Sequence, residues 1–154
     1  MGRAITRIST FDAMSATDHL TALPVQHVFS AHLDIGTPTY VRNGPEGTKL
    51  IVAITGGTIA GDRINGVIVS NSGGDWVSIG ANGEMRIDVR FTILTDDDAT
   101  VYVSYKGVLQ GRRALCGPLF ETGHERYSWL NTSQGIGIGQ SSESGVDYDF
   151  YLLD

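Results

Sequence analysis

Residues 84–107 read EMRIDVRFTILTDDDATVYVSYKG, two runs of alternating apolar and polar residues on either side of an acidic turn. Successive side chains of a β-strand point to opposite faces, so every second residue from Met85 to Ile93 shares one apolar face. The turn TDDDA is rich in Asp, whose side chain bonds its own backbone and favours chain reversal. The stretch therefore predicts an antiparallel β-hairpin.

The rest of the chain repeats this pattern of short runs and turns. Runs rich in β-branched and aromatic residues are separated by segments such as NGPEG, NSGGD and ANG, whose residues favour turns. No apolar period typical of a long helix is present in the domain, so the pattern indicates an all-β protein. The expected strands are residues 26–35, 49–56, 63–71, 75–80, 84–94, 100–107, 126–139 and 146–153.

About eight antiparallel strands in one small domain avoid exposed edges most completely when they close into a barrel. We therefore predict a single antiparallel β-barrel over residues 25–154, with a two-sheet sandwich as the alternative. Residues 1–24 have no sustained period and end at Pro24, which predicts a partly disordered N-terminal extension. A chain of 154 residues can bury about 70% of its unfolded surface, enough for a core without disulfides.

Charge and composition argue against several classes of partner. The formal net charge is −6, and Lys and Arg do not cluster beyond the pair Arg112-Arg113, so we expect no nucleic-acid partner. The first 25 residues contain no apolar signal segment, and no run reaches the length of a membrane span. The single cysteine, Cys116, fits a reducing compartment. These features predict a cytoplasmic protein without a membrane partner.

Short motifs along the chain have both a chemical and a structural interpretation. Residues 55–61, TGGTIAG, match the N-terminal signature of bacterial-type asparaginases, in which a threonine attacks an amide. The residues that follow predict a strand rather than a helix, and no second motif of those enzymes is present, so we expect a glycine turn at a strand end. Residues 135–139, GIGIG, similarly lack the helix of a dinucleotide site. The four histidines lack metal-ligand spacing, and we expect neither metal nor cofactor.

Several segments taken in order resemble the domain-of-unknown-function family 3237. They are ITGGTIAGDRINGVIVSNSGGDW, NGEMRIDVRFTILTDDDATVYVSYKGV and FETGHERYSWLN, and the resemblance extends over residues 26–151. It implies a compact antiparallel barrel of calycin-like or allene-oxide-cyclase-like shape, often oligomeric, with no settled activity. TDDDA stands where the family has TDDGA, and the segment before FETG is shorter than usual. The recurrent family positions are Thr58, Asp75, Trp76, Asp88, Arg90, Tyr102, Glu121, Tyr127, Trp129 and Asn131.

The polar face of the strand 84–94 has two interpretations. It is either solvent-exposed or turned into the lumen of a barrel, and we base the predicted site on the second. A carboxylate, a guanidinium and phenols in one lumen could perform acid–base chemistry. The predicted catalytic residues are Asp88 as acid or base, Arg90 as the orienting or oxyanion-stabilising group, and Tyr102 or Tyr127 as the proton partner. The residues expected to contact a substrate are Thr58, Trp76, Glu121, Trp129 and Asn131.

Three functions are compatible with such a barrel. The leading hypothesis is a cofactor-independent cyclase, isomerase or lyase/hydratase that acts on a small, mostly apolar, oxygenated metabolite. The first alternative is a lipocalin-like binding protein with the same pocket and no reaction. The second is a structural or oligomerising barrel whose charged face is simply solvated. The expected partners are a small molecule and further copies of the chain in a homo-oligomer.

Overall fold

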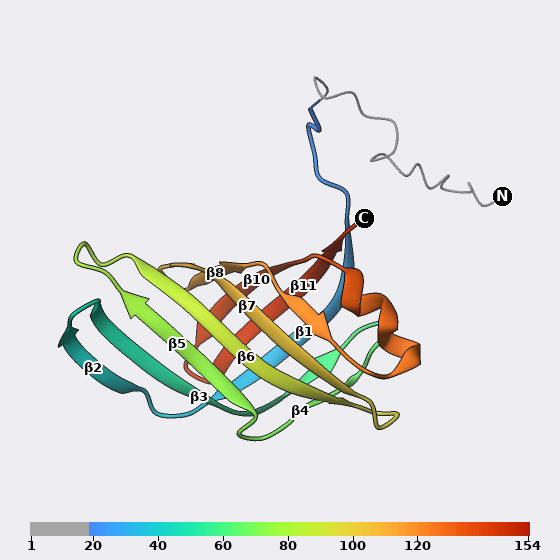
Figure 1. Cartoon of the computed structure of the whole chain (residues 1–154), viewed down its shortest axis with the longest axis horizontal. Helices are drawn as coiled ribbons and strands as arrows, with labels where there is room; N and C mark the ends of the chain where they lie inside the picture. The colour runs from blue at the N-terminus through green and yellow to red at the C-terminus, as the bar shows by residue number, and fades with distance from the viewer. Residues whose placement is uncertain (1–18) are drawn as a thin grey trace.

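The structure is a computed structural model that describes residues 19–154 (Figure 1). Eight strands close an antiparallel barrel in the order β1–β3–β5–β6–β7–β8–β10–β11, and β11 pairs again with β1. The barrel strands are β1 (Val25–Ile35), β3 (Gly47–Ala60), β5 (Gly73–Ile79), β6 (Met85–Thr95), β7 (Thr100–Gln110), β8 (Arg113–Cys116), β10 (Gly135–Ser142) and β11 (Gly145–Leu153). The predicted closed barrel is confirmed.

Three short strands and one helix lie outside the barrel circuit. The strands are β2 (Thr39–Gly44) and β4 (Gly66–Ile68), which pair with β3, and β9 (Leu119–Glu121), which pairs with β7. The helix is η1 (Glu125–Thr132), a 3-10 helix between β9 and β10. Most of the predicted N-terminal extension lies outside the described residues, and no helix within 19–154 is long and apolar enough to cross a membrane.

Two local predictions are wrong. The segment RYSWLN is helix η1 rather than strand, because the His124 ring accepts a hydrogen bond from the Arg126 amide and starts a turn. The three-residue spacing of Tyr127 and Leu130 then buries both side chains, which alternation in a strand would not do. Residues 55–60 of TGGTIAG lie inside β3 and only Gly61 follows the strand, so the segment is not a turn after it. There the φ of +140° at Gly57 lets the backbone of β1 approach so closely that a Cβ would overlap the His32 carbonyl.

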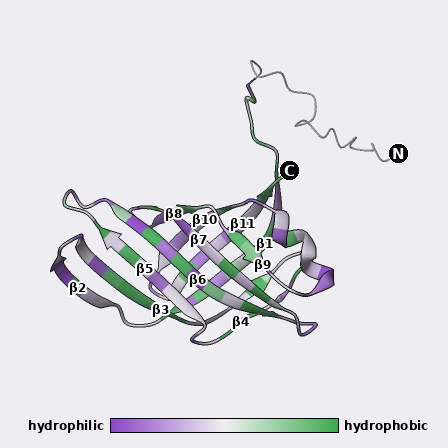
Figure 2. Cartoon of the chain, in the orientation of Figure 1, coloured by the Kyte–Doolittle hydropathy of each residue, from purple (hydrophilic) through white to green (hydrophobic). Residues whose placement is uncertain are grey.

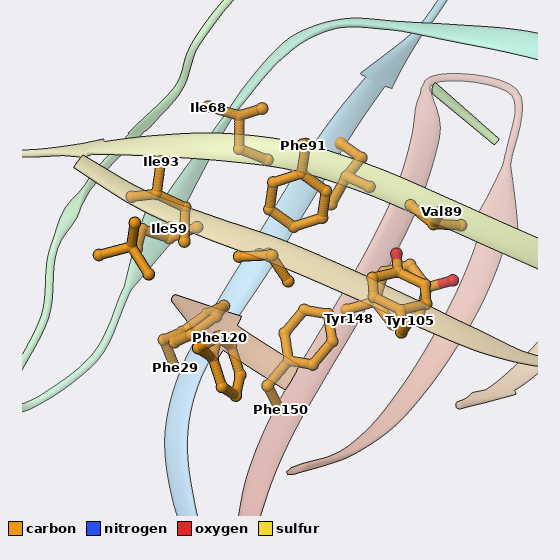
Figure 3. Close-up of a cluster of buried hydrophobic side chains, with 14 of the residues drawn as sticks. Phe29, Ile59, Ile68, Val89, Phe91, Ile93, Tyr105, Phe120, Tyr148 and Phe150 are labelled. Carbon is orange, nitrogen blue, oxygen red and sulfur yellow. The ribbon is translucent and has the colours of Figure 1, made fainter. Parts of the chain in front are cut away.

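Apolar side chains fill one end of the barrel. Figure 2 shows apolar and polar residues alternating along the strands, and the inward residues at this end include Phe29, Phe91, Phe120 and Phe150, each at most 2% exposed. Their rings cluster in Figure 3, with the Phe29 and Phe150 centroids 5.0 Å apart. Helix η1 adds Leu130, which is 0% exposed, to the same core. We call this end of the barrel the closed end.

A substitution at the closed end tests this core. Phe120→Ala removes a ring that is 2% exposed, and we expect a loss of about 3–5 kcal/mol in the free energy of unfolding, measured by urea denaturation. The neighbouring Leu119 is 52% exposed and is the matched control, for which Leu119→Ala should change stability by no more than about 0.5 kcal/mol. Equal losses for the two variants would contradict the assigned inward face of β9.

Candidate functional site

The barrel lumen contains a cavity of about 220 Å³ at the end opposite the phenylalanine core. Its walls come from the last residues of β1, β5 and β7 and from the first residues of β3, β6 and β11, which antiparallel pairing brings to one end. We call it the lumen cavity and its end of the barrel the open end. Most of its lining is aliphatic, and the polar lining residues are Asp75, Tyr105, Arg112, Ser141 and Tyr148.

Asp75 carries a carboxyl group inside this apolar wall. The ladder between β5 and β6 is interrupted after Asp75–Val89 and resumes at Ser78–Arg86. Beside this gap the Asp88 amide donates a hydrogen bond of 3.1 Å to one Asp75 carboxylate oxygen. Burial raises the pKa of Asp75 from an ordinary 3.8 to about 6, although the amide hydrogen bond lowers it. Asp75 can therefore exchange a proton near neutral pH.

Two tyrosines form the boundary between the lumen cavity and the phenylalanine core. The Tyr105 and Tyr148 ring centroids are 5.5 Å apart, and Tyr148 stacks on Phe150 at 5.1 Å (Figure 3). Burial raises the pKa of both phenols, and the nearby Asp75 charge contributes to the rise. The Tyr105 hydroxyl is buried and makes no hydrogen bond of good geometry among the described residues, and the Tyr148 hydroxyl is the polar group that interacts with it. A buried hydroxyl without a partner is costly, and a bound ligand or water would satisfy it.

Glycines on β10 make room for this aromatic boundary. A Cβ on Gly139 would lie 2.5 Å from the Tyr148 ring, and one on Gly137 would lie 2.8 Å from the Phe150 ring. The GIGIG segment is therefore a strand whose inward positions lack side chains because the rings of β11 occupy that space. The thiol of Cys116 lies close by, and burial raises its pKa to about 12, so it stays protonated.

The prediction that Asp88 and Arg90 line the lumen is wrong. Alternation on β6 buries Ile87, Val89 and Phe91, which turns the acid and the guanidinium outward. Their side chains are 31% and 43% exposed, and they form an ion pair of 3.4 Å. The lumen keeps an empty volume of only about 220 Å³ between mostly apolar side chains. Turning the charged pair into this space would carry a large desolvation cost, so the apolar face of β6 faces the lumen instead.

The outward residues of β3, β5, β6 and β7 form a shallow groove of about 660 Å³. Trp76 is 40% exposed there, and the Arg90 guanidinium lies 5.3 Å from its ring centroid. Lys106 approaches Asp88 at 3.9 Å from the next strand. Two of the predicted site residues, Trp76 and Asp88, therefore line the groove on the outer face of the barrel, and Arg90 lies beside it in contact with both.

Three further predicted residues lie beside a second outer hollow, which is lined partly by Tyr102, Glu121 and Asn131. Tyr102 and Glu121 are paired on β7 and β9. The side-chain oxygen of Asn131 accepts a hydrogen bond from the Thr122 backbone amide at 2.8 Å, and the side-chain nitrogen of Asn131 donates one to the Thr122 carbonyl at 2.9 Å. Asn131 thus joins helix η1 to the loop after β9. Thr58 is exposed and lies elsewhere, on the outward face of β3.

The last two predicted residues stabilise the closed end. The Tyr127 hydroxyl donates to Asp97 at 2.6 Å, and this bond is the main reason that the pKa of Asp97 is lowered. The Trp129 indole donates to the Arg126 carbonyl at 3.1 Å, and the Arg63 guanidinium lies 3.7 Å from its ring centroid. These contacts attach η1 to the β6–β7 turn and to the loop after β3.

All nine predicted site residues lie in the described part of the chain, and none of them lines the lumen cavity. The sequence contained a weak signal for the residues that do. Asp75, in the segment SGGDW, is among the family positions given above, and Tyr105 lies on the apolar face of its strand, where a phenol is unusual among valines. Within residues 19–154, no three His, Cys, Asp or Glu side chains gather closely enough to hold a metal ion.

The family model described as "Protein of unknown function (DUF3237)" matches residues 23–153. The chain belongs to this family. A UPF0311 protein of Rhodopseudomonas palustris is 30% identical over 149 residues, covering 85% of this chain and 97% of that protein. A hydroalkoxylation enzyme of Penicillium herquei is 33% identical over 109 residues, covering 70% of this chain and 68% of the enzyme.

Solved structures share the DUF3237 barrel. A Rhodopseudomonas palustris protein of unknown function superposes with a TM-score of 0.81 at 25% identity, covering 88% of this chain and 100% of that one. A β-barrel-like protein of Acinetobacter baumannii gives 0.73 at 28% identity, covering 88% and 100%. An enzyme of Penicillium herquei gives 0.75 at 25% identity, covering 89% and 98%.

Asp75→Asn tests the burial of the carboxyl group. Because the fold raises its pKa, Asp75 contributes stability below pH 3.8 that is lost as pH rises to about 6. An amide keeps the acceptor oxygen and has no charge to bury. We expect the variant to match the parent at pH 4 and to exceed it by about 2–3 kcal/mol at pH 8, measured by urea denaturation at both pH values. The exposed Asp62→Asn controls for net charge, and an equal gain there would contradict the interpretation.

Asn131→Ala tests whether this predicted contact residue is structural. The variant loses both hydrogen bonds to Thr122, and we expect about 1–3 kcal/mol lower stability by thermal or urea unfolding. Glu121→Gln, on the adjacent exposed position of β9, should leave stability within about 0.5 kcal/mol. Unchanged stability in Asn131→Ala would show that the amide does not hold η1 in place.

Proposed function

We propose that the protein is an acid–base enzyme that adds a hydroxyl group across a carbon–carbon double bond within a small, mostly apolar metabolite and so closes a ring. The observation that carries the proposal is the Asp75 carboxyl group, which has a pKa of about 6 inside an apolar cavity beside two phenols. The cavity volume of about 220 Å³ is below the range of roughly 300–1,000 Å³ for drug-sized ligands, which favours a small substrate.

The proposed reaction balances with proton transfers alone. Protonated Asp75 gives its proton to one alkene carbon, and the substrate oxygen forms a bond to the other. The hydroxyl proton returns to the Asp75 carboxylate, directly or through a phenol, so substrate and product are isomers. Because the Asp88 amide holds one carboxylate oxygen, the other is left for the proton transfer. No oxidant or reductant is consumed.

The tyrosines would position the reacting oxygen. The Tyr105 hydroxyl makes no hydrogen bond of good geometry among the described residues, so a substrate hydroxyl would complete its hydrogen bonding and would be held next to the acid. Tyr148 lies beside it, and its raised pKa keeps the phenol protonated and able to donate a hydrogen bond. The aliphatic walls contributed by Leu50, Val77 and Ile87 would exclude water, which otherwise competes for a carbocation-like intermediate.

The similarity to the hydroalkoxylation enzyme of Penicillium herquei supports this reaction class, since hydroalkoxylation is the addition of an O–H bond to an alkene. The reaction also lies within the cyclase class predicted from the sequence, although the residues proposed for it, Asp75, Tyr105 and Tyr148, are not the ones predicted. The alternative function is a lipocalin-like binding protein. Its support is the mostly aliphatic lining of the cavity, which can hold an apolar ligand without any reaction.

Paired substitutions on the two sides of β5 and β6 test the proposal. The purified protein is incubated with 2-allylphenol and 3-allyl-4-hydroxybenzoate, and the dihydrobenzofuran products are measured by chromatography and NMR. We expect Asp75→Asn to reduce turnover by at least about 100-fold, the usual contribution of a general acid. Asp88→Asn, on the outer face, should retain turnover within about 3-fold.

If Asp88→Asn loses turnover and Asp75→Asn keeps it, the reaction takes place in the outer groove. Tight binding of both compounds without any turnover, in the parent protein and in both variants, would favour the binding-protein alternative. Loss of turnover in Asp88→Asn alone would contradict the lumen site.

A further inference from the structure

Most of the basic side chains in the described part of the chain already have a partner. Six of the nine Lys and Arg residues in 19–154 contact an acid or an aromatic ring: Arg42, Lys49, Arg63, Arg90, Lys106 and Arg126. Three have neither kind of partner there: Arg86, Arg112 and Arg113. Of these three, only Arg112 lines the lumen cavity.

The fold fixes the position of Arg112 at the open end. It lies in the turn between β7 and β8, where Gly111 has a φ of +62°. The Arg112 carbonyl accepts hydrogen bonds from the Ser141 amide at 2.9 Å and from the Ser141 hydroxyl at 3.3 Å. These two bonds join the turn to β10. The side chain is exposed, but its backbone is held at the cavity rim.

Arg112 and Asp75 lie at different depths of the cavity. Tyr105, which borders Asp75, is five residues before the end of β7, a distance of roughly 16 Å along a strand. Arg112 follows that strand end in the turn. The cavity therefore has a cation at its rim and an ionisable acid at its base, with aliphatic walls between them.

We propose that Arg112 determines substrate specificity by binding a carboxylate at the end of the substrate opposite its reacting double bond. A guanidinium presents a planar pair of donors that matches a carboxylate and retains its charge at any physiological pH. A carboxylate at the base of the cavity would meet the like charge of Asp75 and a low-dielectric wall, whereas at the rim it meets Arg112 and water. The alkene end then enters first.

The substrate class is a small hydroxyalkene acid. The orientation of the alkene toward Asp75 rests on the proposed function, but the preference of the rim for an anion does not. An experiment with unreactive probes separates the two. The probes are 4-hydroxy-3-propylbenzoate and its primary amide, which have the same shape, lack a double bond and differ in charge.

Dissociation constants are measured by isothermal titration calorimetry for the parent protein, Arg112→Gln and Arg113→Gln. In the parent, we expect the carboxylate to bind about 5- to 10-fold more tightly than the amide, as for a partly exposed charge-assisted pair. In Arg112→Gln the two constants should agree within about 2-fold. Arg113→Gln removes the same charge from the adjacent residue, which does not line the cavity, and should keep the full preference. Thermal melting confirms that all three proteins are folded.

Three results would overturn the inference: equal binding of the two probes to the parent, loss of the preference in Arg113→Gln as well, or no binding of either probe to the folded parent. The failure of the proposed function looks different. If the carboxylate preference depends on Arg112 while 3-allyl-4-hydroxybenzoate is never converted, the rim site stands and the hydroalkoxylation reaction does not.

Discussion

The interior of the barrel is filled from one end only, and the stack of Phe150 on Tyr148 marks where the filling stops. An eight-stranded barrel has an interior that side chains can just fill or that can hold one small ligand. Here the phenylalanines fill one half, and the other half keeps a cavity of about 220 Å³. The glycines of β10 permit the stack, because side chains at Gly137 or Gly139 would occupy the space of these rings. The position of the cavity and of the buried Asp75 carboxyl group at its base both follow from this arrangement.

Alternation predicted the strands well but did not decide which face is the inside. For β6 the two faces are clearly separated, and the apolar face fills the lumen as the desolvation cost of charges requires. Assigning the lumen to Asp88 and Arg90 needed a second layer outside the barrel, and the barrel has none among the described residues. Asp75 is the opposite case. It lies inward on a strand with few apolar neighbours in sequence, and its burial depends on partners from β3, β6 and β7 that the sequence alone does not bring together.

The segment RYSWLN was not predictable from its composition either. Tyr, Trp and Leu favour strands, and the alternation of Tyr127, Trp129 and Asn131 is typical of one. The three-residue spacing of Tyr127 and Leu130 was the competing signal, and a single short helix is too brief for a period to be recognised. The His124 cap and the contacts of η1 with distant loops decide the conformation, and these contacts exist only in the folded chain.

The residues of the segments that resemble the family therefore divide into two groups. Asp97 receives hydrogen bonds from Thr95 at 2.7 Å and from Tyr127 at 2.6 Å, and Arg126 approaches it at 3.1 Å. The TDDDA turn, FETG and YSWLN thus meet at the closed end, where they attach η1 to the barrel. Contacts of this kind stabilise the fold and do not by themselves indicate chemistry. Asp75 belongs to the second group, because burial of its charged form lowers stability above pH 6. An uncharged asparagine side chain would accept the hydrogen bond from the Asp88 backbone amide equally well. A carboxyl group buried at a net cost to stability is the observation on which the proposed proton transfer rests.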